Sequence, residues 1–319
     1  MEYLASILRF SSYYFIFISF YLVTSQNLIN IENFKPVISF IVLFCFVISI
    51  IQISSGNMPF MNGAHRLSSI YGQTPAGFAL LMLFCSIFYF SVYFFEDSIK
   101  DKKRVLFLAI LSALMMYATQ SRQALATLII FLFIVLLMNS SWILKVIYSF
   151  FIVIVLWCIY WLLLNTSIFP RITDMLTRDD TDSSTQTRKN IIDITINNLE
   201  GLDKYIGVGL GGFNQFYFKN TGELGVAAHN DFLLFYIEGG FVAFISYIFF
   251  LTFATVFWFK AYKKYGKKFL VPLSIFVAIY ICSFLNNPFY YPQIQVLVSA
   301  TLGIYLSYYI KYKKSLFNH

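Results

Sequence analysis

Apolar residues fill most of this chain in long stretches that short polar loops separate. Nine stretches of roughly 17 residues or more are long enough to cross the hydrocarbon layer of a membrane as helices. They lie at about 3–24, 36–53, 75–95, 104–120, 122–138, 142–164, 230–259, 269–286 and 292–310. Lipid offers the backbone no hydrogen bonds, so stretches of this kind must be helical. The pattern predicts an all-α polytopic membrane protein of about nine transmembrane helices.

One long polar segment interrupts this pattern, between Asn165 and Gly240. It holds ten of the fifteen acidic residues and ends in the sequence AAHNDFLLFYIEGGF. We therefore expect three parts: transmembrane helices over 1–164, an extracytoplasmic loop with short helices over 165–229, and transmembrane helices over 230–319. The polar loop is the part in which chemistry is expected, and the remainder resembles a membrane scaffold.

Composition supports the membrane assignment. The chain is 59% hydrophobic, 20% aromatic and only 12% charged, whereas soluble domains carry about 25% charged residues. The net charge of +8 does not indicate nucleic acid, because most of the excess Lys and Arg lies in short loops, where it orients the chain.

Three basic clusters define the expected topology. They are Lys100, Lys102, Lys103 and Arg104; Lys260, Lys263, Lys264, Lys267 and Lys268; and Lys311, Lys313 and Lys314. The positive-inside rule makes all three cytoplasmic. The segments 165–229 and 54–74 then face outward, and so does Met1. An outward N-terminus implies that the first stretch does not fully cross or that the sequence lacks earlier spans.

Cysteine and metal chemistry are not expected. Cys45, Cys85, Cys158 and Cys282 all lie in apolar stretches without CxxC spacing, which is typical of small core residues. The acidic run at 179–182 lacks the glycine and the closing Glu of a calcium loop. The sequence therefore predicts neither a metal site nor a cofactor.

A glycine-rich stretch, GVGLGGF at 207–213, lacks the Lys-Ser/Thr of a phosphate-binding loop. It predicts a tight turn that lets the backbone approach a substrate.

The stretch from Val105 to Met138 is too long for one span and too short for two full ones. It predicts a hairpin of two short helices with Arg122 at its tip, slightly below the outer surface. A buried arginine costs several kcal/mol unless it has a partner or a wet cavity, which makes Arg122 a candidate for function.

Four residues converge on the outer face by topology: Arg66, Arg122, Arg188 and His229. Arginine suits phosphate because its planar donors never lose their charge, and histidine exchanges a proton near neutral pH. Each also has a structural interpretation, since arginines anchor spans, pair with carbonyls or carry surface charge, and a lone histidine at a span end is commonly structural. Together they favour a phosphorylated lipid substrate.

The neighbours of these residues complete the candidate site. Arg188 is expected to begin a short amphipathic helix whose apolar face comprises Ile192, Ile196 and Leu199. Glu238 is expected to orient a partner such as an arginine, and it cannot pair simply with His229 unless Gly239-Gly240 breaks the helix.

The order of these motifs resembles that of the O-antigen polymerase and O-antigen ligase superfamily. The elements are an outer loop with Arg66, Gly72 and Pro75; a hairpin tip with Ser121 and Arg122; the GVGLGGF turn; and the sequence HNDFLLFYIEGG at 229–240. The resemblance covers roughly residues 60–300. The chain is short for this family, and the missing spans are expected at its N-terminus.

The resemblance implies a metal-independent glycosyltransferase in the bacterial inner membrane, with its site on the periplasmic or outer face. Arg122 and Arg188 would hold the diphosphate of an undecaprenyl-diphosphate-linked glycan, and His229 would activate the acceptor hydroxyl. Arg66 matches the arginine of the earlier outer loop. Arg171, Asn230 and Glu238 are further candidates for substrate binding. A chain-length regulator is a possible partner.

Three other interpretations stay open. A ligase would transfer the finished polymer to lipid A core, and the shortness of the chain and its richness in Phe, Ile, Tyr and Asn favour a polymerase only by association. A flippase for lipid-linked sugars would bury ionisable groups near the midplane, whereas polar residues here concentrate at the outer rim. A non-catalytic scaffold would tolerate loss of all three charged site residues.

Overall fold

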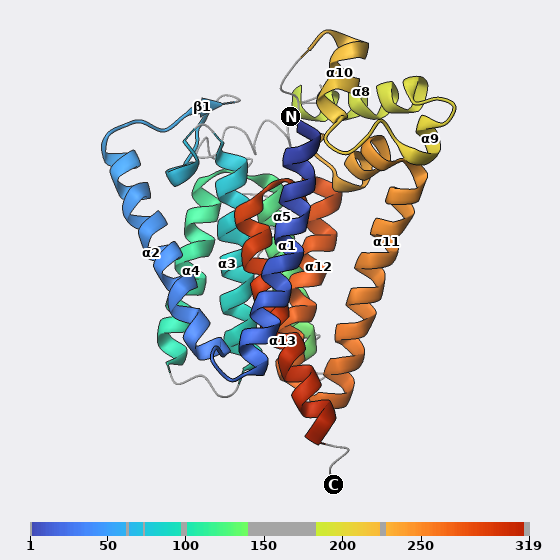
Figure 1. Cartoon of the computed structure of the whole chain (residues 1–319). Coiled ribbons are helices and arrows are strands. Elements are labelled where there is room, and N and C mark those ends of the chain that lie inside the picture. The colour runs from blue at the N-terminus through green and yellow to red at the C-terminus, as the bar shows by residue number, and fades with distance from the viewer. Residues whose placement is uncertain are drawn as a thin grey trace. The chain divides into compact units, whose positions relative to one another are not determined.

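The computed structural model describes residues 2–61, 64–72, 74–96, 101–139, 183–223 and 228–315. Helices dominate these residues, and the β-structure among them is one short antiparallel ribbon (Figure 1). Five helices are long and apolar enough to cross a membrane: Ile7–Ser25, Ile31–Ser54, Pro75–Phe95, Asp231–Tyr265 and Lys267–Phe284. The all-α polytopic fold expected from the apolar pattern is confirmed. The expected span at 142–164 lies outside the described residues.

The chain forms two compact units that do not follow chain order. Unit 1 comprises Met1–Ile31 together with Thr181–His319, and unit 2 comprises Glu32–Asp180. The sequence pattern predicted three parts that follow one another along the chain. A linear pattern of this kind cannot reveal that the first helix packs with the last. Each unit is described here by itself.

Unit 2 is built around a central helix. Its elements are α2 (Ile31–Ser54), β1 (Phe60–Met61), β2 (Ala64–His65), η1 (Ser69–Tyr71), α3 (Pro75–Phe95), α4 (Lys102–Ala118) and α5 (Arg122–Asn139). Helix α3 is apolar on all sides and buried along most of its length, as expected of a helix enclosed by others. Helices α4 and α5 both pack against it. The hairpin expected from the length of the 105–138 stretch is therefore present.

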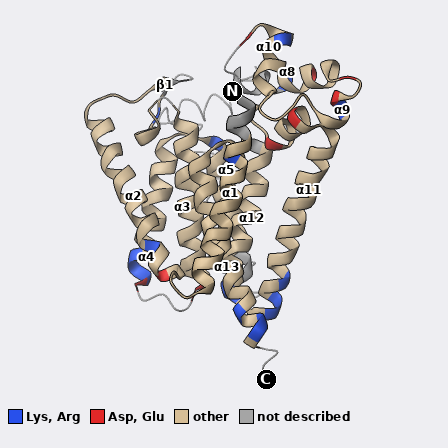
Figure 2. Ribbon diagram, in the orientation of Figure 1, with Lys and Arg blue, Asp and Glu red and all other residues tan. Residues whose placement is uncertain are grey.

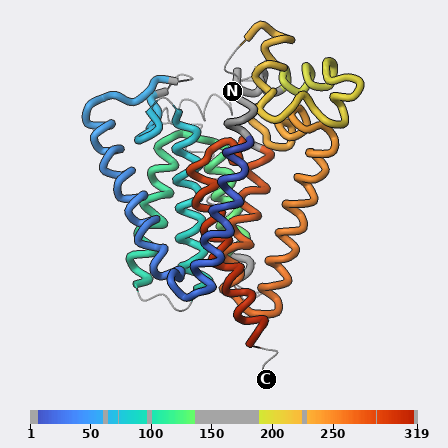
Figure 3. Tube along the Cα trace, in the orientation of Figure 1, coloured from blue at the N-terminus to red at the C-terminus, as the bar shows by residue number. Residues whose placement is uncertain are grey.

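Unit 1 contains the remaining described elements. They are α1 (Glu2–Ser25), α8 (Ser183–Asn198), α9 (Asp203–Ile206), α10 (Phe213–Thr221), α11 (Asp231–Tyr265), η2 (Lys267–Phe269), α12 (Leu270–Leu285), η3 (Pro288–Tyr290) and α13 (Pro292–Ser315). Helix α1 runs alongside α13, from the opposite end of the chain (Figure 3). A 2.8 Å hydrogen bond from Lys311 Nζ to the carbonyl of Thr24 joins their C-terminal ends. The helices therefore run parallel.

Helix α11 bends sharply at Gly240, where the backbone adopts φ 65° and ψ −164°. In a straight helix the 16 residues between Asp231 and Tyr247 would span about 24 Å. Instead, the Tyr247 hydroxyl lies 3.4 Å from the Asp231 carboxylate, and the rings of Phe235 and Tyr247 stack at 4.4 Å. The first segment of α11, residues 231–239, thus folds back against the start of the second.

This bend changes the expected span at 230–259. The part of α11 that can cross the membrane as a straight helix begins after Gly240. From Phe241 to Phe259 it offers roughly 19 residues, or about 28 Å, close to the hydrocarbon thickness of about 30 Å. Its large exposed side chains include Phe249, Phe250 and Phe253, which suit contact with lipid.

Candidate functional site

The His-Asn-Asp sequence at 229–231 forms the start of α11. His229 has a left-handed backbone conformation with φ 54°, which is uncommon for a residue with a side chain and is a feature of functional sites. Asn230 is the N-cap: its Oδ1 accepts from the Leu233 N–H at 3.1 Å. Its Nδ2 donates to the Phe284 carbonyl at 3.3 Å. The sequence suggested that Asn230 binds substrate. In the structure its side chain caps α11 and also contacts the Phe284 carbonyl.

Asp231 is the centre of a buried polar cluster. Its side chain is fully buried, and its Oδ2 accepts from Ser283 Oγ at 3.1 Å and from the Phe289 N–H at 3.3 Å. The Tyr247 hydroxyl also donates to Oδ2, and it lies 2.6 Å from Ser283 Oγ. A buried carboxylate is costly unless several donors surround it. This cluster therefore ties the start of α11 to α12 and η3 and holds the His229 turn in place.

Sequence reasoning missed the importance of Asp231. It singled out Glu238 as the acid near the outer end of the span, but Asp231 is the fully buried one and Glu238 is half-buried. The two lie on the same short segment of α11. An acid at the start of a long apolar stretch is a signal that could have been found. Its partners Tyr247 and Ser283 could not have been paired with it without the Gly240 bend.

The glycine-rich turn packs against this bend. Because Gly240 leaves the helical conformation, the carbonyls of Ile237 and Glu238 accept from outside the helix, from the N–H groups of Val208 at 2.9 Å and Gly209 at 3.0 Å. The fit is close, since a Cβ on Gly207 would come within 2.3 Å of the Glu238 backbone. We expected this turn to bring backbone close to a substrate. In the structure it brings backbone close to α11.

Helices α8 and α10 cover the first segment of α11. Ile191, Leu199, Phe213, Phe216 and Ile237 form a buried apolar cluster between them, together with Tyr217 and Ala228. At the edge of this cluster the Tyr217 hydroxyl donates to Glu223 Oε2 at 3.4 Å. Burial and the nearby carboxylate raise the pKa of Tyr217. The loop helices thus form a layer over the His229 motif.

One expectation about α8, its first residue, was wrong. The helix begins at Ser183 rather than at Arg188, so Arg188 lies within it. The apolar face expected to rest on the membrane or the spans comprised Ile192, Ile196 and Leu199, of which Leu199 is buried within the protein whereas Ile192 and Ile196 are 43% and 66% exposed. The buried face carries Ile191, Thr195 and Leu199. The side chain of Arg188 and the whole of Arg171 lie outside the described residues.

In unit 2, Arg66 fastens the loop that carries it to the hairpin tip. Its side chain is buried, and its Nε donates to the Thr119 carbonyl at 2.7 Å. The Leu67 N–H donates to the Ala118 carbonyl at 3.3 Å, and Gln120 Nε2 donates to the His65 carbonyl at 3.3 Å. Arg122 follows this tip directly as the first residue of α5 and is half-buried. The structure therefore brings Arg66 to the tip that carries Arg122.

The candidate residues are thus divided between the units. Arg66 and Arg122 lie at one end of unit 2, whereas His229, Asn230 and Glu238 lie at one end of unit 1. In each unit, the end that carries these candidate residues is opposite to an end that is rich in lysine or arginine. Unit 1 has lysines at the C-terminal ends of α11 and α13, and unit 2 has Lys102, Lys103 and Arg104 at the start of α4 (Figure 2).

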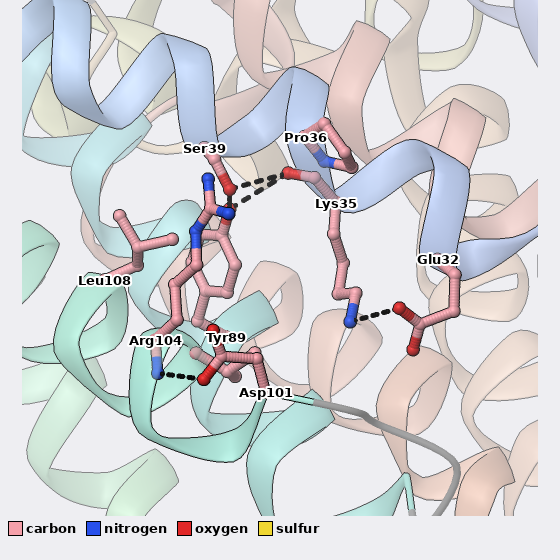
Figure 4. A pocket seen from close by; sticks show the side chains of 9 residues that line it. Glu32, Lys35, Pro36, Ser39, Tyr89, Asp101, Arg104 and Leu108 are labelled. Atoms are coloured by element: carbon pink, nitrogen blue, oxygen red, sulfur yellow. Dashed lines mark hydrogen bonds and ion pairs between the residues drawn. The ribbon is translucent and has the colours of Figure 1, made fainter.

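A pocket in unit 2 lies at its basic end and contains none of the candidate residues. Glu32, Lys35, Tyr89, Asp101 and Arg104 line it, among others (Figure 4). The Lys35 ammonium pairs with Glu32 at 2.6 Å, and the Tyr89 hydroxyl lies 2.8 Å from Ser39 Oγ. Two acids balance its two cations, so the pocket has no clear preference for an anion.

The fold and these motifs define a class: a multi-pass helical membrane protein in which a loop layer covers a histidine turn at one end of the bundle. The comparison with protein families assigns part of the chain to a family. Residues 107–248 match the family described as O-Antigen ligase. This region includes the hairpin tip, α8 to α10 and the first turns of α11. This match covers less than half of the chain, and it supports the resemblance to the O-antigen ligase and polymerase superfamily. No match was found among curated proteins.

Proposed function

We propose that the protein polymerises undecaprenyl-diphosphate-linked oligosaccharide repeat units of O-antigen or capsule on the outer face of the bacterial inner membrane. The observation that carries the proposal is the His229 turn, which Asn230 caps, Asp231 anchors and the glycine-rich turn braces. It lies within the region that matches the O-antigen ligase family. The family match supports a ligase or polymerase type of enzyme, and the choice of polymerase is ours.

The proposed chemistry needs few groups. A hydroxyl of the acceptor sugar attacks the anomeric carbon of the donor glycan while the bond to the lipid diphosphate breaks. His229 accepts the hydroxyl proton, and Arg122 and Arg188 stabilise the charge that grows on the departing diphosphate. The leaving group is already activated, so no metal ion is required. Arg66 holds the tip that carries Arg122, while Arg171, Asn230 and Glu238 shape the substrate site.

The charge distribution of each unit supports an outer site. Lysine and arginine favour the cytoplasmic side of a membrane, so the basic ends of units 1 and 2 would both be cytoplasmic. His229 in unit 1 and Arg122 in unit 2 would then both lie toward the outer face. Lipid-linked glycans are polymerised there, and a chain-length regulator would meet the enzyme on this side.

The test is loss of chain growth in the intact bacterium. His229→Ala and Arg122→Ala should each abolish the ladder of polysaccharide lengths on a gel while the protein stays inserted. His229→Asn is a sharper variant, because Asn tolerates a left-handed backbone and should keep the turn. His65→Ala is the matched control on a histidine outside the proposed site. Normal ladders from the His229 and Arg122 variants would refute the assignment.

A ligase is the alternative within the family, and the match to the family described as O-Antigen ligase favours it. The product of the His229 variant separates the two. Loss of a ligase leaves full-length polymer on the lipid carrier, whereas loss of a polymerase leaves single repeat units on the lipid A core.

A flippase is the alternative from another class, and Asp231 is the observation that bears on it, because transporters bury ionisable groups. Here Oδ1 of Asp231 accepts no hydrogen bond from the described residues, whereas Oδ2 accepts hydrogen bonds from structural donors on α11, α12 and η3. This favours an anchor over a proton or ion site. Transport of labelled lipid-linked sugar into vesicles that persists in His229→Ala would revive the flippase.

A further inference from the structure

Arg9 is a charged residue inside the apolar stretch of α1. The stretch that can span a membrane runs from Ile7 to Ser25, so Arg9 is its third residue. Its side chain is half-buried. A charge within the hydrocarbon layer costs at least about 2.5 kcal/mol near the centre, and such residues face a wet cavity or a partner. The position of Arg9 therefore calls for an explanation.

The packing of α1 gives the depth of Arg9. The Thr24 carbonyl accepts from Lys311 at the basic end of unit 1. Arg9 precedes Thr24 by 15 residues, or about 22 Å along a helix. The hydrocarbon layer is about 30 Å thick. If the basic end marks the inner boundary, Arg9 lies several Å below the outer one, and its long side chain reaches the rim.

Its neighbours place Arg9 next to the His229 motif. The guanidinium carbon lies 5.0 Å from the centre of the Tyr290 ring. The adjacent Phe289 donates its N–H to Asp231. The Phe10 ring contacts Phe235, on the first segment of α11, at 6.2 Å. Arg9 is thus a guanidinium that unit 1 itself brings beside the segment that begins at His229.

The Arg9 guanidinium has donors to spare. The guanidinium lies over the face of Tyr290 and interacts electrostatically with Tyr13, and among the described residues no carboxylate or carbonyl accepts a hydrogen bond from it. A ring face attracts a cation but does not use its five N–H donors. Tyr290 is itself 52% exposed, so its ring does not enclose the guanidinium. An anion with several oxygens would satisfy those N–H donors.

We propose that Arg9 is a further substrate-binding residue, whose guanidinium contacts a phosphate of the lipid-linked diphosphate on the unit that carries His229. The Tyr290 ring attracts the guanidinium through its face, and the N–H donors of the guanidinium would serve phosphate oxygens. The proposal rests on the proposed function, because that function supplies the diphosphate. An arginine that only anchored α1 at the interface would show no preference between a lipid with a phosphate and one without.

The test uses purified full-length protein in nanodiscs and measures binding of undecaprenyl diphosphate and of undecaprenol, which lacks phosphate. Arg9→Gln should weaken binding of undecaprenyl diphosphate by about ten- to hundredfold, as expected for a charge-assisted hydrogen bond, and leave undecaprenol binding unchanged. Arg9→Lys should bind undecaprenyl diphosphate with an affinity between those of the wild type and Arg9→Gln. Arg104→Gln, at the basic end of unit 2, is the matched control and should bind undecaprenyl diphosphate like the wild type.

A second pair tests the ring. Tyr290→Phe keeps the aromatic face and should preserve binding, whereas Tyr290→Leu removes it and should weaken binding severalfold. The melting temperature of each variant shows whether it folds. Wild-type affinity in a folded Arg9→Gln would overturn the proposal, and so would equal losses for both lipids. If the wild-type protein binds the two lipids equally, the proposed function itself fails. The proposal for Arg9 then fails as well, because the proposed function supplies its diphosphate ligand.

Discussion

The Nε atom of Arg66 donates a 2.7 Å hydrogen bond to the carbonyl oxygen of Thr119, 53 residues further along the chain. Thr119 ends α4 and its carbonyl faces away from the helix, so Arg66 supplies a donor that the helix cannot. The contact fixes the loop that carries Arg66 to the tip of the α4–α5 hairpin. Arg66, which the sequence suggested for substrate binding, thus makes a structural contact within the protein.

Arg66→Ala should destabilise the protein by about 1.5–3 kcal/mol, because it removes a buried charged donor and leaves the Thr119 carbonyl without it. Arg66→Lys should recover part of this loss, since an ammonium can donate but cannot reproduce the Nε geometry. Thermal unfolding of the purified protein in detergent measures both. Lys103→Ala, an exposed residue at the start of α4, is the control. An unchanged melting temperature in Arg66→Ala would show that the hydrogen bond contributes no stability.

The bend of α11 gives a second prediction. A Cβ on Gly240 would lie 2.2 Å from the Tyr205 backbone, and φ there is 65°. Gly240→Ala should therefore cost more than about 2 kcal/mol, because both strain and collision oppose it. Gly222→Ala isolates the strain: φ is 75°, but nothing lies within 4 Å of a Cβ there. It should cost about 1 kcal/mol. Equal losses in the two variants would mean that the contact with α9 is loose.

The sequence was informative where a pattern is local. Lengths of apolar stretches identified the helices of both units, and the 34-residue stretch around Arg122 predicted the α4–α5 hairpin. The glycine pair after Glu238 was recognised as a possible break, and Gly240 is that break. These features depend on residues close together in the chain.

Features that depend on distant contacts could not be predicted in this way. The pairing of α1 with α13 joins opposite ends of the chain, and no periodicity indicates it. The donors of Asp231 come from α11, α12 and η3, and they meet only because the bend returns Asp231 to the level of Tyr247. The face of α8 that packs within the protein, with Ile191 and Thr195, was not predicted, because both sides of the helix carry isoleucine.

The Asp231 cluster gives a third prediction. Asp231→Ala leaves the Ser283, Tyr247 and Phe289 donors unsatisfied and should cost about 2–4 kcal/mol. Tyr247→Phe removes a single donor and should cost about 1 kcal/mol. If the cluster holds the His229 turn, Asp231→Asn should reduce chain growth more than Tyr247→Phe does at a similar level of folded protein. Gel ladders, normalised to membrane-inserted protein, make this comparison, and full activity in Asp231→Asn would argue that the turn holds its shape without the carboxylate.

Two adjacent isoleucines on α8 offer the most direct check of the loop layer. Ile191 is 1% exposed within the cluster that joins α8 and α10 to α11, whereas Ile192 is 43% exposed. Ile191→Ala should cost about 2–5 kcal/mol, because it opens a cavity in a packed core. Ile192→Ala should change stability by less than about 0.5 kcal/mol. Limited proteolysis of the loop should follow the same order, with faster cleavage in Ile191→Ala alone. If Ile192→Ala is the more damaging variant, the face expected from the i, i+4, i+7 spacing covers α11 after all, and the layer over the His229 turn is rotated by about 100° from the arrangement described here.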